Sequence, residues 1–308
     1  MDKPFLTIEE QVERLKLRGL AVDDNTRIIL MRESYYSIVN GYKDPFIDRV
    51  ESGRANDDRY RKGCSFDDLY NLFLFDRKLR HLTFEYLIQA EAVFKTAVVY
   101  IFSKHHKEEE NAFLSQENFC NKKEFHNPRR YAFELSKLVG LLNEKVERSE
   151  LPYVKYYRDN HSCIPLWVLV NEMTFGNIIH FFELMKPYER ESAGRMVAEA
   201  VGRWGDKRTG YFGGDKMFKT AEVLRRFRNV CAHDERLYSK KVGISPVSYF
   251  QMIWMLEHYL TKSEFEEFVQ RLSSLINEFS RKNKAFISVI RNEGFSDFEL
   301  EFKKCSGK

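Results

Sequence analysis

Residues 65–102 have the sequence SFDDLYNLFLFDRKLRHLTFEYLIQAEAVFKTAVVYIF, and this stretch sets the expected fold class. Its apolar residues recur at the three- and four-residue spacing of an amphipathic helix, from Leu69 onward. Ser65 followed by Asp68 is typical of the start of a helix. We therefore expect one long helix that begins near Ser65 and continues to about Phe102.

Shorter stretches with the same helical spacing lie on both sides of this one. Thr7 with Glu10 matches a capping box, in which a side chain and a backbone N–H at the helix start satisfy each other. Further helices are predicted to begin at Asp215, at Ser245 before Pro246, and at Ser263. No segment shows the sustained alternation that is typical of strands. The sequence therefore predicts a mainly α fold, a helical bundle with few or no strands.

The polar stretches suggest how the chain is divided. Residues 44–64 are polar and contain Pro, Gly and Asn, which predicts a loop or linker. We expect a small N-terminal helical unit over residues 1–60 and a larger helical domain over residues 61–308. Residues 103–130 are rich in charge, and residues 202–214 hold five of the 15 glycines. Both segments are predicted to be loop insertions in the larger domain.

Composition excludes several classes of protein. The chain has 308 residues, of which 43% are hydrophobic, so it is not an intrinsically disordered chain. Gly and Pro number only 15 and 7, which favours helices. The apolar stretch 87–102 carries Glu91 and Lys95, so we expect no membrane span. No signal-peptide pattern opens the sequence, which indicates a cytoplasmic protein.

The cysteines and histidines give no sign of a metal or cofactor site. The five cysteines include Cys305, are widely spaced and form no C-x-x-C pair, which favours a reducing compartment over a disulfide framework. His105 and His106 near residues 108–110 lack the fixed spacing of a zinc helix. No phosphate-binding glycine loop and no G-x-S-x-G motif is present. We therefore expect no metal and no cofactor.

The net charge of +4 conceals one strongly basic segment. Residues 201–241 contain 11 basic and 5 acidic residues, a local charge of +6. Lys and Arg contact phosphates, and aromatic side chains stack on single-stranded bases. Two interpretations are open: an RNA-binding surface, or a solvated helix face and loop. Candidate RNA contacts are Arg203, Lys207, Arg208, Lys216, Lys219, Arg225, Arg226 and Arg236, with Trp204, Tyr211 and Phe212 as candidate stacking residues.

Arg228 and His233 within this segment have chemistry suited to cutting RNA. On an unbroken helix five steps of ~100° place them about 140° apart, so they share no face. Asn229 and Asp234 are residues that end or cap helices, and a helix end here would turn His233 back towards Arg228. A histidine moves protons near neutral pH, and an arginine stabilises charge on phosphoryl oxygens. The alternative is structural: Arg228 in a salt bridge and His233 at a helix end.

Blocks along nearly the whole chain resemble the Abi (abortive infection) family of bacterial phage-resistance proteins, the group that includes AbiD and AbiF. The blocks are residues 3–11 (KPFLTIEEQ), 34–42 (SYYSIVNGY), 45–46 (PF), 75–80 (FDRKLR), 175–176 (FG) and, most specifically, 224–237 (LRRFRNVCAHDERL). The resemblance implies a HEPN-type helical ribonuclease for antiphage defence, without a metal, in which Arg228, Asn229 and His233 match the catalytic motif. It also implies a homodimer that pairs two such motifs, and an association with a small non-coding RNA.

Two further features carry open interpretations. The resemblance implies an Arg and a His in the helix that here contains Glu91, Lys95 and Ile101. Glu91 and Lys95, four residues apart, form either an internal ion pair or support for the Arg228–His233 pair. Without that second basic pair, an RNA-binding scaffold with absent or latent catalysis is the alternative function.

Tyrosines near the N-terminus raise a separate choice. Tyr35, Tyr36 and Tyr42 lie near Arg32 and Lys43 in sequence. They form either a base-stacking patch or part of an ordinary core helix with amphipathic tyrosines.

Overall fold

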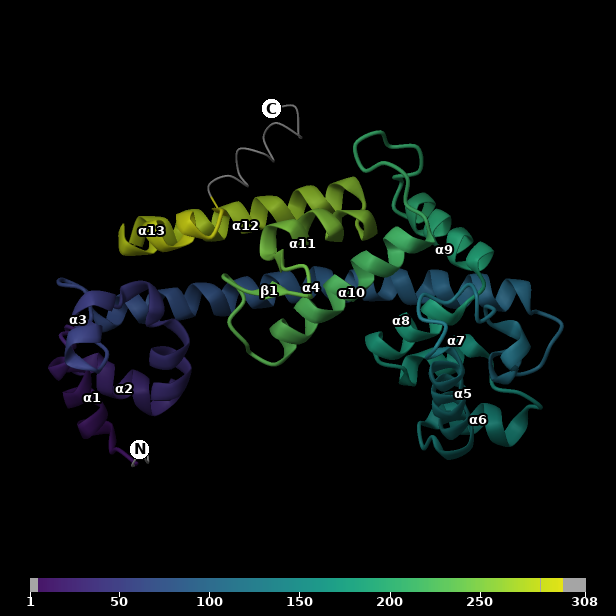
Figure 1. Cartoon of the computed structure of the whole chain (residues 1–308), viewed down its shortest axis with the longest axis horizontal. Helices are drawn as coiled ribbons and strands as arrows, with labels where there is room; N and C mark the ends of the chain where they lie inside the picture. Colours follow the sequence, from purple (N-terminus) through teal and green to yellow (C-terminus); the bar gives the residue numbers. More distant parts are fainter. Residues whose placement is uncertain (1–4, 283, 296–308) are drawn as a thin grey trace. The chain divides into compact units, whose positions relative to one another are not determined.

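The structure is a computed structural model that describes residues 5–282 and 284–295. Lys3, Pro4 and Cys305 therefore lie outside the described residues. Figure 1 shows helices throughout, with strands confined to one short hairpin among the described residues, which confirms the predicted mainly α fold. The chain forms two compact units. Unit 1 comprises residues 1–82, 234–240 and 269–308, and unit 2 comprises residues 83–233 and 241–268.

The predicted division at residue 60 stays a prediction. In the structure, the chain passes between the units within helix α4 (Phe66–His105), after His233, after Lys240, and within helix α12 (Lys262–Lys282).

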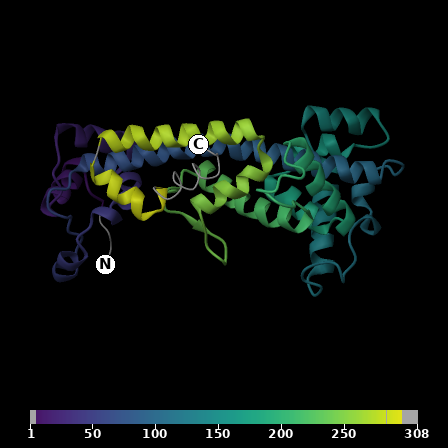
Figure 2. The same ribbon diagram turned by 90° about the horizontal axis from the view of Figure 1, so that it is seen from above.

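Unit 1 contains the first part of α4, the later part of α12, and short helices. The described elements are α1 (Ile8–Leu17), α2 (Asp24–Glu33), a π-helical turn (Tyr36–Asn40), a 3₁₀ turn (Asp44–Phe46), α3 (Arg49–Ala55) and α13 (Lys284–Asn292). In the core of the unit, the ring of Phe75 meets those of Phe279 and Phe286 edge-on, with centroids 5.6 and 4.7 Å away. Figure 2 shows this part of α12 running beside α4.

Unit 2 is built from the rest of α4 and the helices that pack on it. The other elements are 3₁₀ turns (Ala112–Leu114, Gln116–Asn118, Val170–Glu172, Glu257–Tyr259), α5 (Tyr131–Arg148), α6 (Pro152–Asn160), α7 (Leu166–Leu169), α8 (Phe175–Leu184), α9 (Pro187–Ala200), α10 (Gly214–Ala232), β1 (Lys241–Val242), β2 (Val247–Ser248) and α11 (Tyr249–Leu256). The strands pair antiparallel. Phe94 of α4 packs edge-on against Phe175 and Phe182 of α8, at 5.6 and 5.2 Å between centroids.

Close packing of α9 against the start of α10 depends on one glycine. A Cβ atom at Gly194 would lie 2.7 Å from the backbone oxygen of Phe212. A side chain at this position would therefore push the loop before α10 away from α9.

The structure confirms the predicted start of α4 and corrects others. Ser65 and Asp68 cap α4 reciprocally, with the backbone N–H of Ser65 donating to the carboxylate at 2.8 Å. Residues 44–64 are not wholly loop, because Asp48 accepts hydrogen bonds from the N–H groups of Val50 and Glu51 and so starts α3.

Three other helices begin at different residues from those predicted. Helix α10 has Gly213 rather than Asp215 at its N-cap. Ser245 lies in the hairpin turn, and α11 begins after Ser248, whose hydroxyl accepts from the N–H of Gln251. Helix α12 is capped two residues earlier than predicted, by Thr261 and Glu264. Each of these helices thus begins where a reciprocal cap or a close approach is available, not at the first matching residue type.

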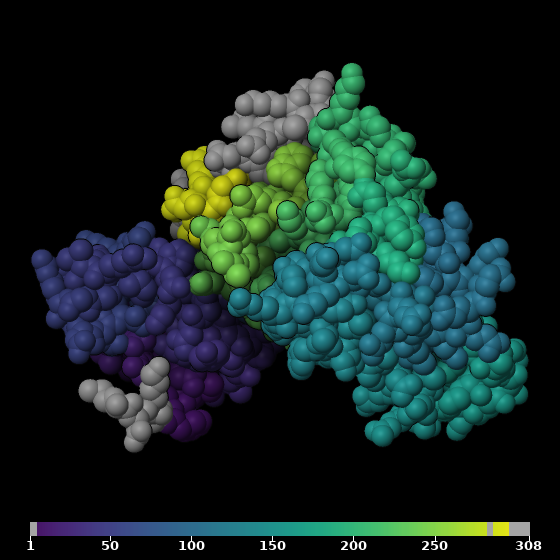
Figure 3. All heavy atoms as spheres, turned by 45° about the vertical axis from the view of Figure 1, so that its right-hand side comes forward, coloured from purple at the N-terminus to yellow at the C-terminus, as the bar shows by residue number. Residues whose placement is uncertain are grey.

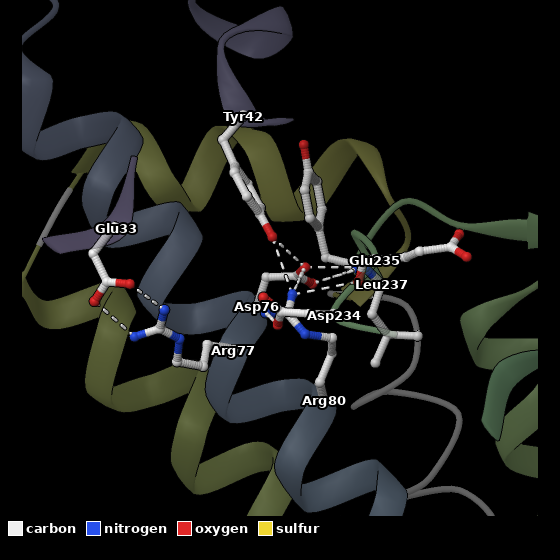
Figure 4. Close-up of polar contacts among 9 residues, drawn as sticks. Glu33, Tyr42, Asp76, Arg77, Arg80, Asp234, Glu235 and Leu237 are labelled. Carbon is white, nitrogen blue, oxygen red and sulfur yellow. Dashed lines mark hydrogen bonds and ion pairs between the residues drawn. The ribbon is translucent and has the colours of Figure 1, made fainter. Parts of the chain in front are cut away.

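A buried network of charged and polar groups ties three segments of unit 1 together (Figure 4). The carboxylate of Asp76 is 0% exposed and accepts from Tyr42 at 2.7 Å and from Arg80 at 2.7 Å. It also accepts from the backbone N–H groups of Leu237 and Tyr238, at 3.0 and 2.7 Å. Burial raises the pKa of the Asp76 carboxyl, and these four donors oppose that rise.

Arg80 extends this network to residue 234. Its guanidinium pairs with the carboxylate of Asp234, and it also donates to the backbone oxygen of Glu235 at 3.4 Å. The segment 234–240 is therefore held in unit 1 through its backbone as well as its side chains.

We predict that Asp76→Ala lowers the free energy of unfolding by about 3–5 kcal/mol, because Arg80 loses its buried counter-charge and the N–H groups of Leu237 and Tyr238 lose their acceptor. Lys78→Ala is the matched control on the same helix. This substitution removes the ion pair of Lys78 with Glu278. The two side chains are 53% and 39% exposed, so the loss should lower the free energy of unfolding by at most about 1 kcal/mol. Urea unfolding measures both, and equal losses in the two variants would contradict the prediction.

Candidate functional site

The end of helix α10 places the predicted Arg228, Asn229 and His233 on one helical turn and its cap. The helix ends at Ala232, and the N–H of His233 donates to the backbone oxygen of Asn229 at 2.9 Å. Asp234 then takes the left-handed conformation, with φ of +56°. The helix therefore stops where Asp234 had suggested, and His233 is exposed at its end.

Arg228 is held from one side by the predicted supporting pair. Its Nε atom lies 3.2 Å from Oε2 of Glu91, and the other oxygen of Glu91 lies 2.8 Å from Nζ of Lys95. Lys95 also donates to the backbone oxygen of Met173 at 2.9 Å. Glu91 thus forms the internal ion pair and contacts Arg228 at the same time, so the two alternatives are compatible.

The geometry of this contact leaves part of the guanidinium available. Glu91 is 8% exposed, and the Arg228 side chain is 32% exposed. The contact is an ion pair without hydrogen-bond alignment, since neither Nε nor Oε2 has a hydrogen-bond partner among the described residues. Nη1 makes one long hydrogen bond of 3.4 Å to Asn229. A guanidinium has five N–H donors, so Arg228 keeps donors for a phosphate.

Part of the predicted basic surface is turned inward to hold the loop before α10. Arg203 is 5% exposed, and its Nη1 lies 3.1 Å from the buried carboxylate of Glu257. Arg208 also pairs with Glu257, and Lys216 donates to the backbone oxygen of Thr209 at 2.9 Å. These three cations stabilise the shape of the loop.

Other predicted contacts face solvent. Lys207, Lys219 and Arg226 are exposed.

The two remaining predicted contacts are held by protein partners. Arg225 is half-buried and forms two hydrogen bonds with Glu222, at 3.0 and 3.1 Å. Arg236 belongs to unit 1, where it donates to the backbone oxygen of Gly41 at 3.0 Å.

The loop of residues 202–213 carries two exposed aromatic side chains. Figure 3 shows this loop, in green, standing out from the surface of unit 2. Trp204 is 46% exposed and Tyr211 66%. The guanidinium of Arg195, which sequence reasoning missed, lies 4.7 Å from the centre of the Trp204 ring. The prediction for Phe212 is wrong: it is 3% exposed and stacks on His258 at 4.6 Å, which makes it part of the core.

Sequence reasoning also missed the role of Asp76, Arg80 and Glu257. The i, i+4 spacing of Asp76 and Arg80 was a signal for an ion pair on one helix face. Nothing local to the sequence indicates that Glu257 receives Arg203 and Arg208 from a loop about fifty residues earlier.

Comparison with known proteins assigns the family. Residues 28–239 match the model of the Abi-like protein family, which includes the end of α10 and Glu91. The match spans more than half of the chain, so this protein belongs to the Abi-like family. That membership supports a role in abortive-infection defence.

No curated protein and no solved structure matches the chain. Among the described residues, no helix is both long and apolar enough to cross a bilayer.

His258 should make stability depend on pH. Burial, with Lys216, Arg203 and Arg208 nearby, lowers the pKa of His258 to about 4. The folded protein therefore keeps this ring neutral, whereas the unfolded chain protonates it near pH 6.5. We predict that the contribution of His258 to stability falls as the pH drops from about 6.5 to about 4, by about 3 kcal/mol at most.

His258→Phe keeps a ring against Phe212 and cannot be protonated, so it should flatten this part of the pH profile of urea unfolding. His81→Gln, at an exposed position, is the control and should leave the profile unchanged. An unaltered acid slope in His258→Phe would show that another group is responsible.

Proposed function

We propose that this protein is a metal-independent endoribonuclease of abortive-infection defence, with a HEPN-type site formed by Arg228, Asn229 and His233. The observation that supports it most is the helix end itself, which puts an exposed histidine one turn from an arginine held by Glu91. We propose further that the active form is a homodimer in which two copies pair their motifs in one cleft.

The proposed reaction needs only the RNA and these side chains. His233 accepts the proton of the 2′-hydroxyl, whose oxygen attacks the adjacent phosphorus. Arg228 donates hydrogen bonds to the phosphoryl oxygens as their charge grows. The bond to the 5′-oxygen breaks, and a protonated histidine returns the proton to that oxygen. The products are a 2′,3′-cyclic phosphate and a 5′-hydroxyl, and DNA is not cut because it lacks the 2′-hydroxyl.

Exposed residues of unit 2 provide the proposed RNA contacts. Lys207, Lys219 and Arg226 supply positive charge for phosphates. Trp204 and Tyr211 offer ring faces on which single-stranded bases stack. Arg203 is left out of this set because its guanidinium is buried against Glu257.

We predict that Arg228→Ala and His233→Ala each reduce cleavage of single-stranded RNA by at least about 100-fold, because each removes a group that acts in the transition state. The assay uses labelled RNA in the presence of a chelator, with mass spectrometry of the cyclic phosphate end. Arg226→Ala removes the same charge from the same helix and should weaken binding while leaving kcat nearly unchanged. Full activity in both Arg228→Ala and His233→Ala would refute the proposal.

Glu91→Gln tests how Arg228 is held. Glutamine keeps the shape but loses the ion pairs with Arg228 and Lys95, so the guanidinium is less well placed. We predict a loss of kcat between about 10- and 100-fold with little change in KM. A change in KM alone would indicate that Glu91 affects RNA binding instead.

The alternative function is an RNA-binding scaffold that holds a cognate non-coding RNA, with absent or latent catalysis. The ion pair of Arg228 with Glu91 favours it, because it engages the arginine that catalysis requires. Purified protein would then carry RNA, seen as absorbance at 260 nm that added ribonuclease removes, and would leave added RNA intact.

A further inference from the structure

A small cavity in unit 1 lies outside the site described above. It has a volume of about 220 Å³ and is lined by residues 36, 37 and 40–42 of the π-helical turn and its continuation, by Phe73, and by Asp234 and Arg236. Pockets for drug-sized ligands have volumes of about 300–1,000 Å³. This cavity is smaller and therefore suits a single flat ring system.

The backbone on both sides of the cavity adopts rare conformations. Residues Tyr36–Asn40 form a π-helical turn. Such turns are rare in proteins as a whole, but where they occur they are often part of a functional site. Ser34, just before this turn, has φ of +61°, and Asp234 has φ of +56°. A positive φ costs a non-glycine residue free energy. Residues with such strained backbone cluster where a binding or catalytic geometry must be kept.

The buried network holds the wall of the cavity in place (Figure 4). Tyr42 is fixed through its hydroxyl by Asp76, and Asp234 is fixed by its ion pair with Arg80. Asp234 nevertheless keeps a side chain that is 68% exposed. The cavity therefore has a rigid wall with a carboxylate available to a ligand.

The lining chemistry selects the kind of ring. Tyr36 is 76% exposed and Phe73 is 2% exposed, so they supply aromatic surface at the mouth and in the wall. Asn40 is exposed, and no described residue forms a hydrogen bond with its side-chain amide. An asparagine amide both donates and accepts, whereas the carboxylate of Asp234 only accepts. The cavity thus fits a heterocycle that offers an amino group to a carboxylate.

We propose that this cavity binds one unpaired RNA base that carries an exocyclic amino group, adenine, cytosine or guanine, and disfavours uracil. The carboxylate of Asp234 accepts from the amino group, the Asn40 amide pairs with the ring edge, and Tyr36 stacks on the ring. Uracil presents a carbonyl oxygen at that position, which the carboxylate repels. Arg236 contributes positive charge at the rim, although Gly41 and Asp44 already accept hydrogen bonds from it. The inference rests on the proposed function, because it takes single-stranded RNA as the ligand.

Binding of short RNAs to the His233→Ala protein tests this inference without cleavage. Fluorescence anisotropy is measured with labelled eight-nucleotide oligo(A), oligo(C) and oligo(U). We expect oligo(A) and oligo(C) to bind at least about 5-fold more tightly than oligo(U), because the Asp234 carboxylate accepts from an amino group and repels a carbonyl oxygen. Tyr36→Ala and Asn40→Ala should each abolish that preference. Phe5→Ala and Asn25→Ala, which change an exposed aromatic residue and an exposed asparagine of the same unit, should preserve it.

Several outcomes overturn the inference. Equal binding of the three RNAs overturns it. So does a preference that remains in both Tyr36→Ala and Asn40→Ala, provided that the variants have the same melting temperature as the parent protein. Adenosine monophosphate that binds as tightly as oligo(A), and competes for the same site, would assign the cavity to a free nucleotide. Failure of the proposed ribonuclease appears separately, as unchanged RNA cleavage in His233→Ala, and does not alter the binding comparison.

Discussion

The buried carboxylate of Asp76 is the constraint on which the rest of unit 1 depends. A fully buried charge is tolerated only when it is paired and hydrogen-bonded, and Asp76 meets four donors from three separate segments of the chain. Satisfying it fixes the turn that contains Tyr42, helix α4, and the residues that follow α10. A single carboxylate on the long helix thus determines where two distant segments must lie.

Ion pairs hold Arg228 in unit 2 and, separately, Asp234 in unit 1. Within unit 2, Glu91 binds Arg228, and Lys95 balances the charge of Glu91. Within unit 1, Arg80 holds Asp234, the residue whose left-handed backbone follows the helix end. Glu91, which contacts no substrate in the proposed reaction, therefore positions Arg228, which does.

The sequence predicted the elements whose signals are local. The apolar spacing of residues 65–102 gave the long helix, and Ser65 with Asp68 gave its start, since both depend on neighbours in the chain. Asp234 likewise marked the end of α10. The starts of α10 and α11 were missed because a close approach at Gly213 and a hairpin before Ser248 outweigh residue preference. For the site, Arg228, Asn229 and Glu91 were found to be neighbours, whereas Arg203 and Phe212 were buried by partners that no local pattern reveals.

Unit 1 is assembled from three separated stretches of the chain, and this has a consequence for the order of events during synthesis. Phe75 leaves the ribosome about two hundred residues before Phe279 and Phe286, the rings that complete its core. At about 5–20 residues per second, that interval is roughly 10–40 s. Residues 234–238, which supply partners for Asp76 and Arg80, emerge within that interval rather than at its end. A nascent chain therefore cannot complete the core of unit 1 until residues 279–286 have emerged.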